Sequence, residues 1–295
     1  MLSILIPVYN QDVTSLVNDV QKQCDQLQID YQILVFDDKS EDKYRELNAS
    51  LSHSFNVNYV ELSENIGRAK IRNRLGKMAR YKYLLFLDGD TKIVKSDFIS
   101  HYVRDKDKAP VIFGGRGYQK AKPKDIRYIL HWRYGRAVES RSANIRNQNP
   151  YLNFHSNNFL ILSHTFSKHL FDTSVDGYGY EDLLFAESLC EKGARILHID
   201  NETLHDGLEL SERFLDKTKN AVRNLAELNQ QESLINVRLT KFHTKHKSLG
   251  TLKILLWFYK KNEASIVENL KSSSPRLLYY SLFKLYYYNE VIDDL

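Results

Sequence analysis

The sequence predicts an α/β fold: a mostly parallel, mixed sheet flanked by helices, with a helical C-terminal extension. Three observations support this prediction. Short apolar runs alternate with segments of helical periodicity over the first half of the chain. Acidic residues directly follow two of those runs, where the carboxyl ends of parallel strands would meet. From about Leu208 onward, apolar residues recur only at helical spacing.

The first half predicts strands and helices in alternation. Unbroken apolar runs such as YQILVF and YLLFL are typical of strands buried on both faces. Parallel neighbours need helical crossovers between them, which the intervening segments supply. The expected strands are Ser3–Val8, Tyr31–Phe36, Asn56–Leu62, Lys82–Leu87, Pro110–Gly114, Phe159–Leu162 and Arg195–Ile199; the expected helices are Val13–Leu27, a segment from Glu41, Arg68–Ala79, Asp125–Val138 and Leu183–Lys192.

The C-terminal part predicts helices alone. Its segments are rich in Tyr, Phe and Leu with interleaved Lys, which suits a membrane interface. The same composition fits a helical layer packed on the core or on a second subunit, as in a homodimer. The expected helices are Glu209–Leu228, Leu234–Phe242, Leu252–Tyr259 and Leu277–Tyr288, and the expected domains are 1–207 (halves 1–115 and 116–207) and 208–295.

Composition narrows the class of protein. Of the 295 residues, 42% are hydrophobic and 27% charged, as in ordinary globular proteins. Apolar runs are shorter than the ~20 residues of a membrane span, and no basic segment precedes the first strand. We therefore expect a cytoplasmic protein, with peripheral contact at the inner membrane face as an option. The net charge of +5 is concentrated in Arg116–Arg146 and Lys241–Lys261, so an anionic surface or a phosphorylated substrate is an expected partner.

The stretch YLLFLDGDT places two carboxylates two positions apart at the end of a predicted strand. In an extended segment, Asp88 and Asp90 would point to the same side, and Gly89 would allow a ligand to approach the backbone closely. Two neighbouring carboxylates repel each other unless a cation lies between them. Hard oxygen ligands in low number suit Mg²⁺ or Mn²⁺ shared with a diphosphate. A solvated turn with capping aspartates is the alternative.

Six segments, in this order, carry a family resemblance: SILIPVYN, VFDDKSED, ENIGRAKIRN, YLLFLDGDT, YGYEDLLFAESLCEKGARILHI and NETLHDG. Together they resemble the family 2 glycosyltransferases of the GT-A fold, from residue 2 to about residue 207. Lys39 departs from the pattern, because the family more often has a small residue there. The resemblance implies an inverting enzyme that transfers a sugar from a nucleotide-diphosphate sugar, with a UDP-sugar favoured, to a glycan or lipid-linked glycan. Nucleic acid is not an expected partner.

The resemblance also implies roles for individual residues. The base would contact the backbone of Pro7 and Tyr9 and the carboxylate of Asp37 or Asp38. The diphosphate would depend on Mn²⁺ or Mg²⁺. The residues implied for the nucleotide sugar are Pro7, Tyr9, Asp37, Asp38, Asn65, Gly67, Arg72, Asp88 and Gly89, and those implied for the metal are Asp88, Asp90 and His205.

Acceptor activation is expected on the other side of the sugar. Asp182 matches the second acid of the family's ED pair and is the expected general base, with Glu181 orienting the acceptor or capping a helix. Tyr180, in the glycine- and aromatic-bearing segment 177–180, would pack against a sugar. Asn157 and Asn158 would hydrogen-bond acceptor hydroxyls, or form a turn. Arg146 and nearby arginines would hold an acceptor phosphate, or lie on a surface helix.

Other classes of protein fit less well. A nucleotidyltransferase would need a basic, glycine-rich loop after the first strand, where the chain has PVYNQD. A Rossmann dehydrogenase needs G-x-G-x-x-G after a strand, and GGRGYQ does not fit. A non-catalytic glycan- or membrane-binding protein that retains the GT-A fold is the remaining alternative. The DGD and ED acids, which such a protein has no need to keep, are both present.

Overall fold

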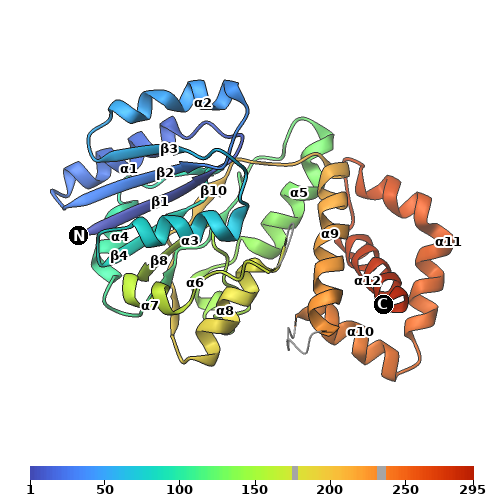
Figure 1. Cartoon of the computed structure of the whole chain (residues 1–295). Helices are drawn as coiled ribbons and strands as arrows, with labels where there is room; N and C mark the ends of the chain where they lie inside the picture. Colours follow the sequence, from blue (N-terminus) through green and yellow to red (C-terminus); the bar gives the residue numbers. More distant parts are fainter. Residues whose placement is uncertain (175–178, 231–236) are drawn as a thin grey trace. The chain divides into compact units, whose positions relative to one another are not determined.

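The computed structural model describes residues 1–174, 179–230 and 237–295, which form two compact units (Figure 1). Unit 1 comprises Met1–Tyr118, Ser140–Ser174 and Glu181–Gly207. Unit 2 comprises Gln119–Glu139, Val175–Tyr180 and Leu208–Leu295. Residues 119–139 thus belong with the C-terminal helices, whereas the sequence analysis grouped them with 116–207. The division of the chain at residue 207 stays a prediction.

Unit 1 is built on a seven-stranded sheet with the order β3-β2-β1-β4-β8-β6-β9. Only β8 runs antiparallel to its neighbours, β4 and β6. The predicted mixed, mostly parallel sheet is therefore confirmed. The strands are β1 (Leu2–Val8), β2 (Tyr31–Asp37), β3 (Val57–Glu61), β4 (Tyr83–Leu87), β6 (Val111–Phe113), β8 (Asn158–Leu162) and β9 (Ile196–His198).

Helices of unit 1 cover both faces of this sheet. Parallel strands buried on both faces need such cover, which explains their unbroken apolar sequences. The helices are α1 (Thr14–Gln26), α2 (Asp42–Asn48), α3 (Arg68–Met78), α4 (Phe98–Asp105), α6 (Ala143–Arg146), α7 (Ser163–Lys168) and α8 (Glu181–Glu191), with a 3₁₀ turn at Ala49–His53.

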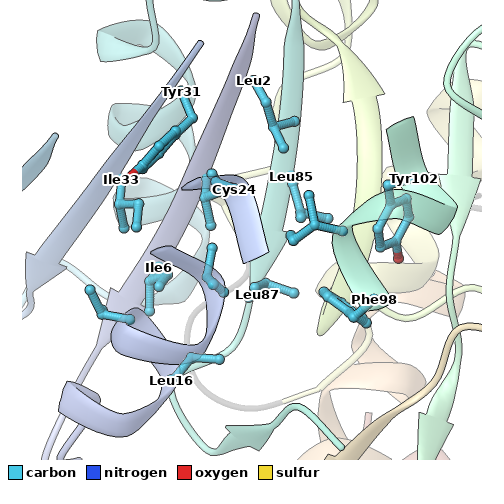
Figure 2. Close-up of a cluster of buried hydrophobic side chains, with 14 of the residues drawn as sticks. Leu2, Ile6, Leu16, Cys24, Tyr31, Ile33, Leu85, Leu87, Phe98 and Tyr102 are labelled. Atoms are coloured by element: carbon cyan, nitrogen blue, oxygen red, sulfur yellow. The ribbon is translucent and has the colours of Figure 1, made fainter. Parts of the chain in front are cut away.

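Side chains of alternate residues in the central strands pack into two separate hydrophobic clusters, one on each face of the sheet. Leu2 and Ile6 of β1 pack with Leu16 of α1 and Phe98 of α4 on one face (Figure 2). Leu5, on the opposite face of β1, belongs to the second cluster. This alternation follows from the two-residue period of a strand. The second cluster contains many aromatic rings, which come from β4, β6, β8, α7, α8 and the segments before β8 and after α7: Phe86, Phe113, Phe154, Phe159, Phe166, Phe171 and Phe185.

A second, three-stranded sheet has the order β5-β10-β7. It joins β5 (Thr91–Lys92), β10 (Thr203–His205) and β7 (Arg116–Gly117). Strand β5 directly follows the DGD segment, and β10 ends at His205. Pairing of His205 with Thr91 therefore places the histidine beside the carboxyl end of β4.

Unit 2 is helical, as predicted. A 3₁₀ turn (Ile126–Tyr128), α5 (Ile129–Tyr134) and a π-helical turn (Gly135–Glu139) replace the single expected helix. Leu130 and Tyr134 pack with Phe214 and Tyr280 of the C-terminal helices. Those helices are α9 (Ser211–Gln230), α10 (Arg238–Ser248), α11 (Leu252–Leu270) and α12 (Leu277–Asp294).

Several expected bounds were wrong. Helix α11 continues eleven residues past Tyr259, because Ile266 and Leu270 maintain its buried stripe. Helix α8 begins at Glu181, so the ED pair forms its first turn. Helices α4, α6 and α7 were not predicted. The expected helix from Leu234 lies partly outside the described residues; its described part is α10. None of the described helices has the length and apolar character that a membrane span requires.

We predict that Gly76→Ala destabilises unit 1, although alanine ordinarily favours a helix. A β-carbon at Gly76 of α3 would lie 2.1 Å from the buried ring of Phe166 in α7. Overpacking of this kind costs about 1–3 kcal/mol of unfolding free energy, measurable by urea denaturation. Adding Phe166→Leu should recover part of the loss by making room. An unfolding midpoint for Gly76→Ala at or above that of the wild type would contradict this packing.

Candidate active site at the carboxyl ends of the strands

The site begins where β1 and β2 end side by side. Pro7 pairs with Phe36 in the parallel register, and the amide of Asp38 donates to the carbonyl oxygen of Val8 at 2.7 Å. Tyr9 follows β1 with 58% of its surface exposed. An exposed ring at the carboxyl end of β1 is available to stack on a planar ligand.

The two aspartates after β2 hold the surrounding loops. The buried carboxylate of Asp37 accepts from the Ser40 amide at 2.6 Å. That of Asp38 accepts from the amides of Ile66 and Gly67 at 2.7 and 2.9 Å. Burial raises the pKa of Asp38, and these two amides oppose the rise. Both acids therefore fix the loop geometry in this structure.

Asn65 and Gly67 shape the turn that starts α3. The side-chain amide of Asn65 donates to the carbonyl oxygen of Asp38 at 3.0 Å. Gly67 adopts φ +82°, a left-handed conformation that favours glycine, at the N-cap of α3. This turn sets the direction of α3 and hence the position of Arg72, one turn later.

Arg72 connects the DGD segment with the ED pair. Its Nη2 donates to Asp88 Oδ1 at 2.7 Å, and only 4% of the arginine side chain is exposed. Asp182 and Glu181 also lie close enough to raise the pKa of Arg72 against the effect of burial. Its buried Nε and Nη1 have no hydrogen-bond partner among the described residues, so they can still donate to a ligand.

Glu181 and Asp182 occupy different environments on the first turn of α8. Glu181 Oε1 lies 3.5 Å from Arg68 Nη1. Asp182 Oδ2 accepts from the Ser156 amide at 3.1 Å and lies 4.0 Å from His155 Nδ1. Asp182 Oδ1 is buried without a hydrogen-bond partner among the described residues. One oxygen of Asp182 is thus fixed and the other is available.

These environments move the two carboxyl pKa values in opposite directions. Burial and the charge of Asp182 raise the pKa of Glu181, although Arg68 and Arg72 oppose this. Burial also opposes ionisation of Asp182, but Arg72, His155 and the Ser156 amide lower its pKa below the ordinary value. Divergent pKa values in one carboxylate pair are the pattern that separates a base from an acid in active sites.

Asp90 and His205 form a second polar group beside the small sheet. His205 Nδ1 lies 3.4 Å from Asp90 Oδ2 and 3.2 Å from Arg116 Nη2. Burial opposes ionisation of Asp90, yet the hydrogen bond and charge of His205, together with Arg116, hold the pKa of Asp90 well below its usual range. Asp90 Oδ1 is buried and lacks a hydrogen-bond partner within the described residues.

The DGD backbone is not extended, contrary to the sequence analysis. The Thr91 amide donates to the carbonyl oxygen of Asp88 at 3.2 Å, which closes a turn at Gly89 and Asp90. A β-carbon on Gly89 would lie 3.3 Å from the carbonyl oxygen of Pro7, so this turn packs closely against β1. Asp88 consequently pairs with Arg72, whereas Asp90 lies beside His205.

The donor set fits a divalent cation in part. Within the described residues, no group of three or more His, Cys, Asp or Glu side chains is arranged to hold a metal ion. Mg²⁺ and Mn²⁺, however, are commonly held by one or two carboxylates together with substrate phosphates. The unpartnered Oδ1 of Asp90 beside His205 matches that arrangement.

The residues expected to contact the acceptor lie in different places. Asn157 is buried, with its Oδ1 unpartnered among the described residues. The Asn158 amide donates to the carbonyl oxygens of Gly115 and Asn201, and its oxygen accepts from Tyr102, so this side chain ties α4 to the loops after β6 and β9. Tyr180 belongs to unit 2 and has a left-handed φ of +71°. Gly177 and Tyr178 lie outside the described residues.

Arg146 does not lie on a surface helix, contrary to one sequence interpretation. It is buried and donates to the carbonyl oxygens of Arg141, Gly114 and Ile199. The guanidinium therefore joins β6 to the end of β9.

Three site residues escaped the sequence analysis: Arg68, Arg116 and His155. Each contacts a predicted acid or histidine from a distant segment. Two of them carried a signal in the sequence: Arg68 lies between the expected nucleotide residues Gly67 and Arg72, and Arg116 begins the basic region Arg116–Arg146.

Comparison with known proteins shows the family to which this chain belongs. The model of the family described as glycosyl transferase family 2 matches residues 3–170, more than half of the chain. A poly(ribitol-phosphate) beta-N-acetylglucosaminyltransferase, TarP of Staphylococcus aureus, is 25% identical over 42% of this chain and 40% of its own length. The chain thus spans less than half the length of the curated relatives it matches.

Solved structures show the same fold. TarS 1–349 of S. aureus in complex with UDP-GlcNAc has a TM-score of 0.52 and 19% identity, covering 99% of this chain and 90% of that one. A mannosyltransferase of Pyrobaculum calidifontis, in complex with GDP-Man and Mn²⁺, has a TM-score of 0.50 and 16% identity, covering 78% and 64%. The predicted GT-A architecture is confirmed, and by its family match this chain belongs to glycosyl transferase family 2.

Proposed function

We propose that this protein transfers a sugar from a nucleotide-diphosphate sugar to a hydroxyl of a glycan or lipid-linked glycan, by metal-dependent single displacement with inversion. UDP-GlcNAc is the first donor to test, because the TarS complex contains it and TarP is named for the same sugar. The observation that carries the proposal is the meeting of Asp88, Arg72 and Asp182 at one sheet edge, with the pKa of Asp182 lowered.

The proposed base is Asp182. Its Oδ1, which has no hydrogen-bond partner among the described residues, would accept the proton of the acceptor hydroxyl as the hydroxyl oxygen bonds to the anomeric carbon. The bond from that carbon to the diphosphate oxygen then breaks, and the electron pair leaves with the nucleoside diphosphate. The Ser156 amide holds the other oxygen of Asp182, which limits rotation of the carboxylate. Glu181, with its raised pKa, would orient the acceptor.

The nucleotide half of the site would hold the leaving group. Tyr9 offers an exposed ring to the base, and Pro7, Asp37, Asp38, Asn65 and Gly67 build the surrounding loops. Arg72 Nε and Nη1 would donate to the nucleotide, and Asp88 would contact its ribose. Asp90 and His205, with Asp88 nearby, would hold Mg²⁺ or Mn²⁺, which neutralises charge on the diphosphate when bound.

The name of one relative indicates an acceptor to test. TarP is named for a poly(ribitol-phosphate) acceptor, so an anionic glycan belongs in an acceptor panel. A cytoplasmic location and a homodimer stay predictions. The alternative function, binding without catalysis, would leave the proposed base and metal acids with a structural role alone. Asp90 Oδ1 and Asp182 Oδ1 disfavour this, because neither has a hydrogen-bond partner in the part of the chain that the structure describes.

Nucleoside diphosphate release from a panel of UDP- and GDP-sugars tests transfer against binding. We expect donor-dependent release that increases when a glycan acceptor is added. Asp182→Asn keeps the shape of the side chain and removes the proton acceptor, so kcat should fall by ~10²–10⁴-fold with little change in donor affinity. Near wild-type turnover by Asp182→Asn, with an inactive Glu181→Gln, would reverse the two assignments.

Metal dependence is tested at Asp90. Asp90→Asn should abolish Mn²⁺- or Mg²⁺-stimulated transfer and weaken Mn²⁺ binding in the presence of UDP, measured calorimetrically. The variant should unfold at a somewhat lower temperature, because the charge of Asp90 pairs with His205 and Arg116, so Mn²⁺ binding is measured below its unfolding transition. Asp206→Asn, at a neighbouring carboxylate outside the proposed ligand set, serves as the control. Full wild-type activity in EDTA would rule the metal out.

Arg72→Gln should alter the pH dependence of transfer. Arg72 lowers the pKa of Asp182, so the proposed base stays ionised as the pH falls. Without this charge the pKa of Asp182 rises, and kcat/KM should be lost at a higher pH on the acid side. Arg72→Lys, which retains the charge, should keep the acid limb closer to that of the wild type. Arg74→Gln on the same helix is the matched control. If the acid side of the kcat/KM–pH profile did not move in Arg72→Gln, Arg72 would not control the pKa of the catalytic base.

A further inference from the structure

Two consecutive helices of unit 2, α10 and α11, expose large apolar side chains. Ile254, Trp257 and Phe258 of α11 are 64%, 62% and 41% exposed. Leu249, at the turn between the helices, is 61% exposed, and Phe242 of α10 is 44% exposed. We call these five residues, together with the basic residues among them, the apolar–basic face.

The face lies on the outward side of α11 within its unit. Positions 254, 257, 258 and 261 recur at the spacing of one helical stripe. The opposite stripe, Leu252, Tyr259, Ile266 and Leu270, is buried in the unit's own core. In that unit α11 packs mainly against α12 and α10, and within the described residues the Ile254, Trp257 and Phe258 side chains of its other side stay exposed. Folding of unit 2 therefore does not account for the exposed Trp and Ile.

The charge around the apolar residues has one sign. Residues 238–262 contain seven Lys or Arg and no Asp or Glu. All seven side chains are exposed, and none forms an ion pair with a carboxylate in the described parts of the chain. Lys261 lies 5.1 Å from the ring centre of Trp257. The basic residues are Arg238, Lys241, Lys245, Lys247, Lys253, Lys260 and Lys261.

We propose that the apolar–basic face docks this protein on the surface of an anionic lipid bilayer. Trp257 and Ile254 would enter the interface between head groups and acyl chains, while the lysine ammonium groups contact lipid phosphates. A second copy is a poorer occupant, because symmetric self-contact would oppose two sets of seven positive charges. Like the other described helices, α11 is not long and apolar enough to cross a membrane, so the proposed contact is with the bilayer surface. This inference concerns a partner and does not rest on the proposed transfer reaction.

Vesicle flotation of the full chain tests the proposal. The protein should float with vesicles of phosphatidylcholine mixed with phosphatidylglycerol and stay behind with phosphatidylcholine alone. Removing Lys253, Lys260 and Lys261 together (each →Gln) should weaken binding about fivefold per lysine. A control triple variant of Lys22, Lys77 and Lys192 (each →Gln) has the same net charge but changes exposed residues of unit 1, and it should bind normally.

The apolar contribution is tested separately. Ile254→Ser with Trp257→Ser should reduce flotation, whereas Leu47→Ser with Phe55→Ser, at exposed apolar residues of unit 1, should not. In Trp132→Phe, which leaves Trp257 as the reporter, anionic vesicles should shift the fluorescence to shorter wavelength. The proposal would be overturned if the protein did not float with anionic vesicles. It would also be overturned if variants of the apolar–basic face and their controls lost vesicle binding equally. Conversion of an oligomer to a monomer by Ile254→Ser with Trp257→Ser, measured by light scattering, would overturn it as well, because that identifies a second copy as the occupant.

Discussion

The buried guanidinium of Arg72 is the interaction on which the rest of the site depends. A charge held at 4% exposure is costly unless acids compensate it, and Asp88, Glu181 and Asp182 supply that compensation. These acids come from the end of β4 and the start of α8, which are far apart in the sequence. Arg72 thus requires both segments to meet at the same edge of the sheet. The loop built by Asp38 and Gly67 is what orients α3 so that Arg72 reaches them.

Neighbouring acids in this protein differ through their surroundings. Glu181 and Asp182 are adjacent on one helical turn, yet their pKa values move in opposite directions. The difference arises because burial and the charge of Asp182 raise the pKa of Glu181, whereas Arg72, His155 and the Ser156 amide together lower the pKa of Asp182 against the effect of burial. Asp88 and Asp90 separate in a similar way, since the turn at Gly89 places one beside Arg72 and the other beside His205. In each pair, the backbone conformation determines which neighbouring side chains each carboxylate contacts.

Acids at the ends of strands also build the scaffold. Asp37 and Asp38 were expected at the nucleotide base, and in this structure their carboxylates bind amides of the flanking loops. A carboxylate that accepts backbone N–H groups rigidifies the loops on which the exposed Tyr9 and the backbone of Pro7 depend. Asp37 and Asp38 would therefore contribute to base recognition by fixing the shape of the loop as well as by direct contact with the base. The same reasoning applies to Asn158, whose side-chain amide joins Tyr102 of α4 to Gly115 and Asn201, which follow β6 and β9.

The sequence by itself determined the alternation of strands and helices, the acids at the strand ends and the family motifs. It could do so because strand burial and helical periodicity are local properties of the chain. Tertiary structure alone decided that β8 runs antiparallel, that residues 119–139 pack with the C-terminal helices, and that Arg68, His155 and Arg116 join the acids. The structure also shows that Arg146, which was expected to hold a phosphate or to lie on a surface helix, is buried and hydrogen-bonds to the carbonyl oxygens of Gly114 and Ile199. These features depend on contacts between residues distant in the chain, and no local pattern records which distant partner a side chain will meet.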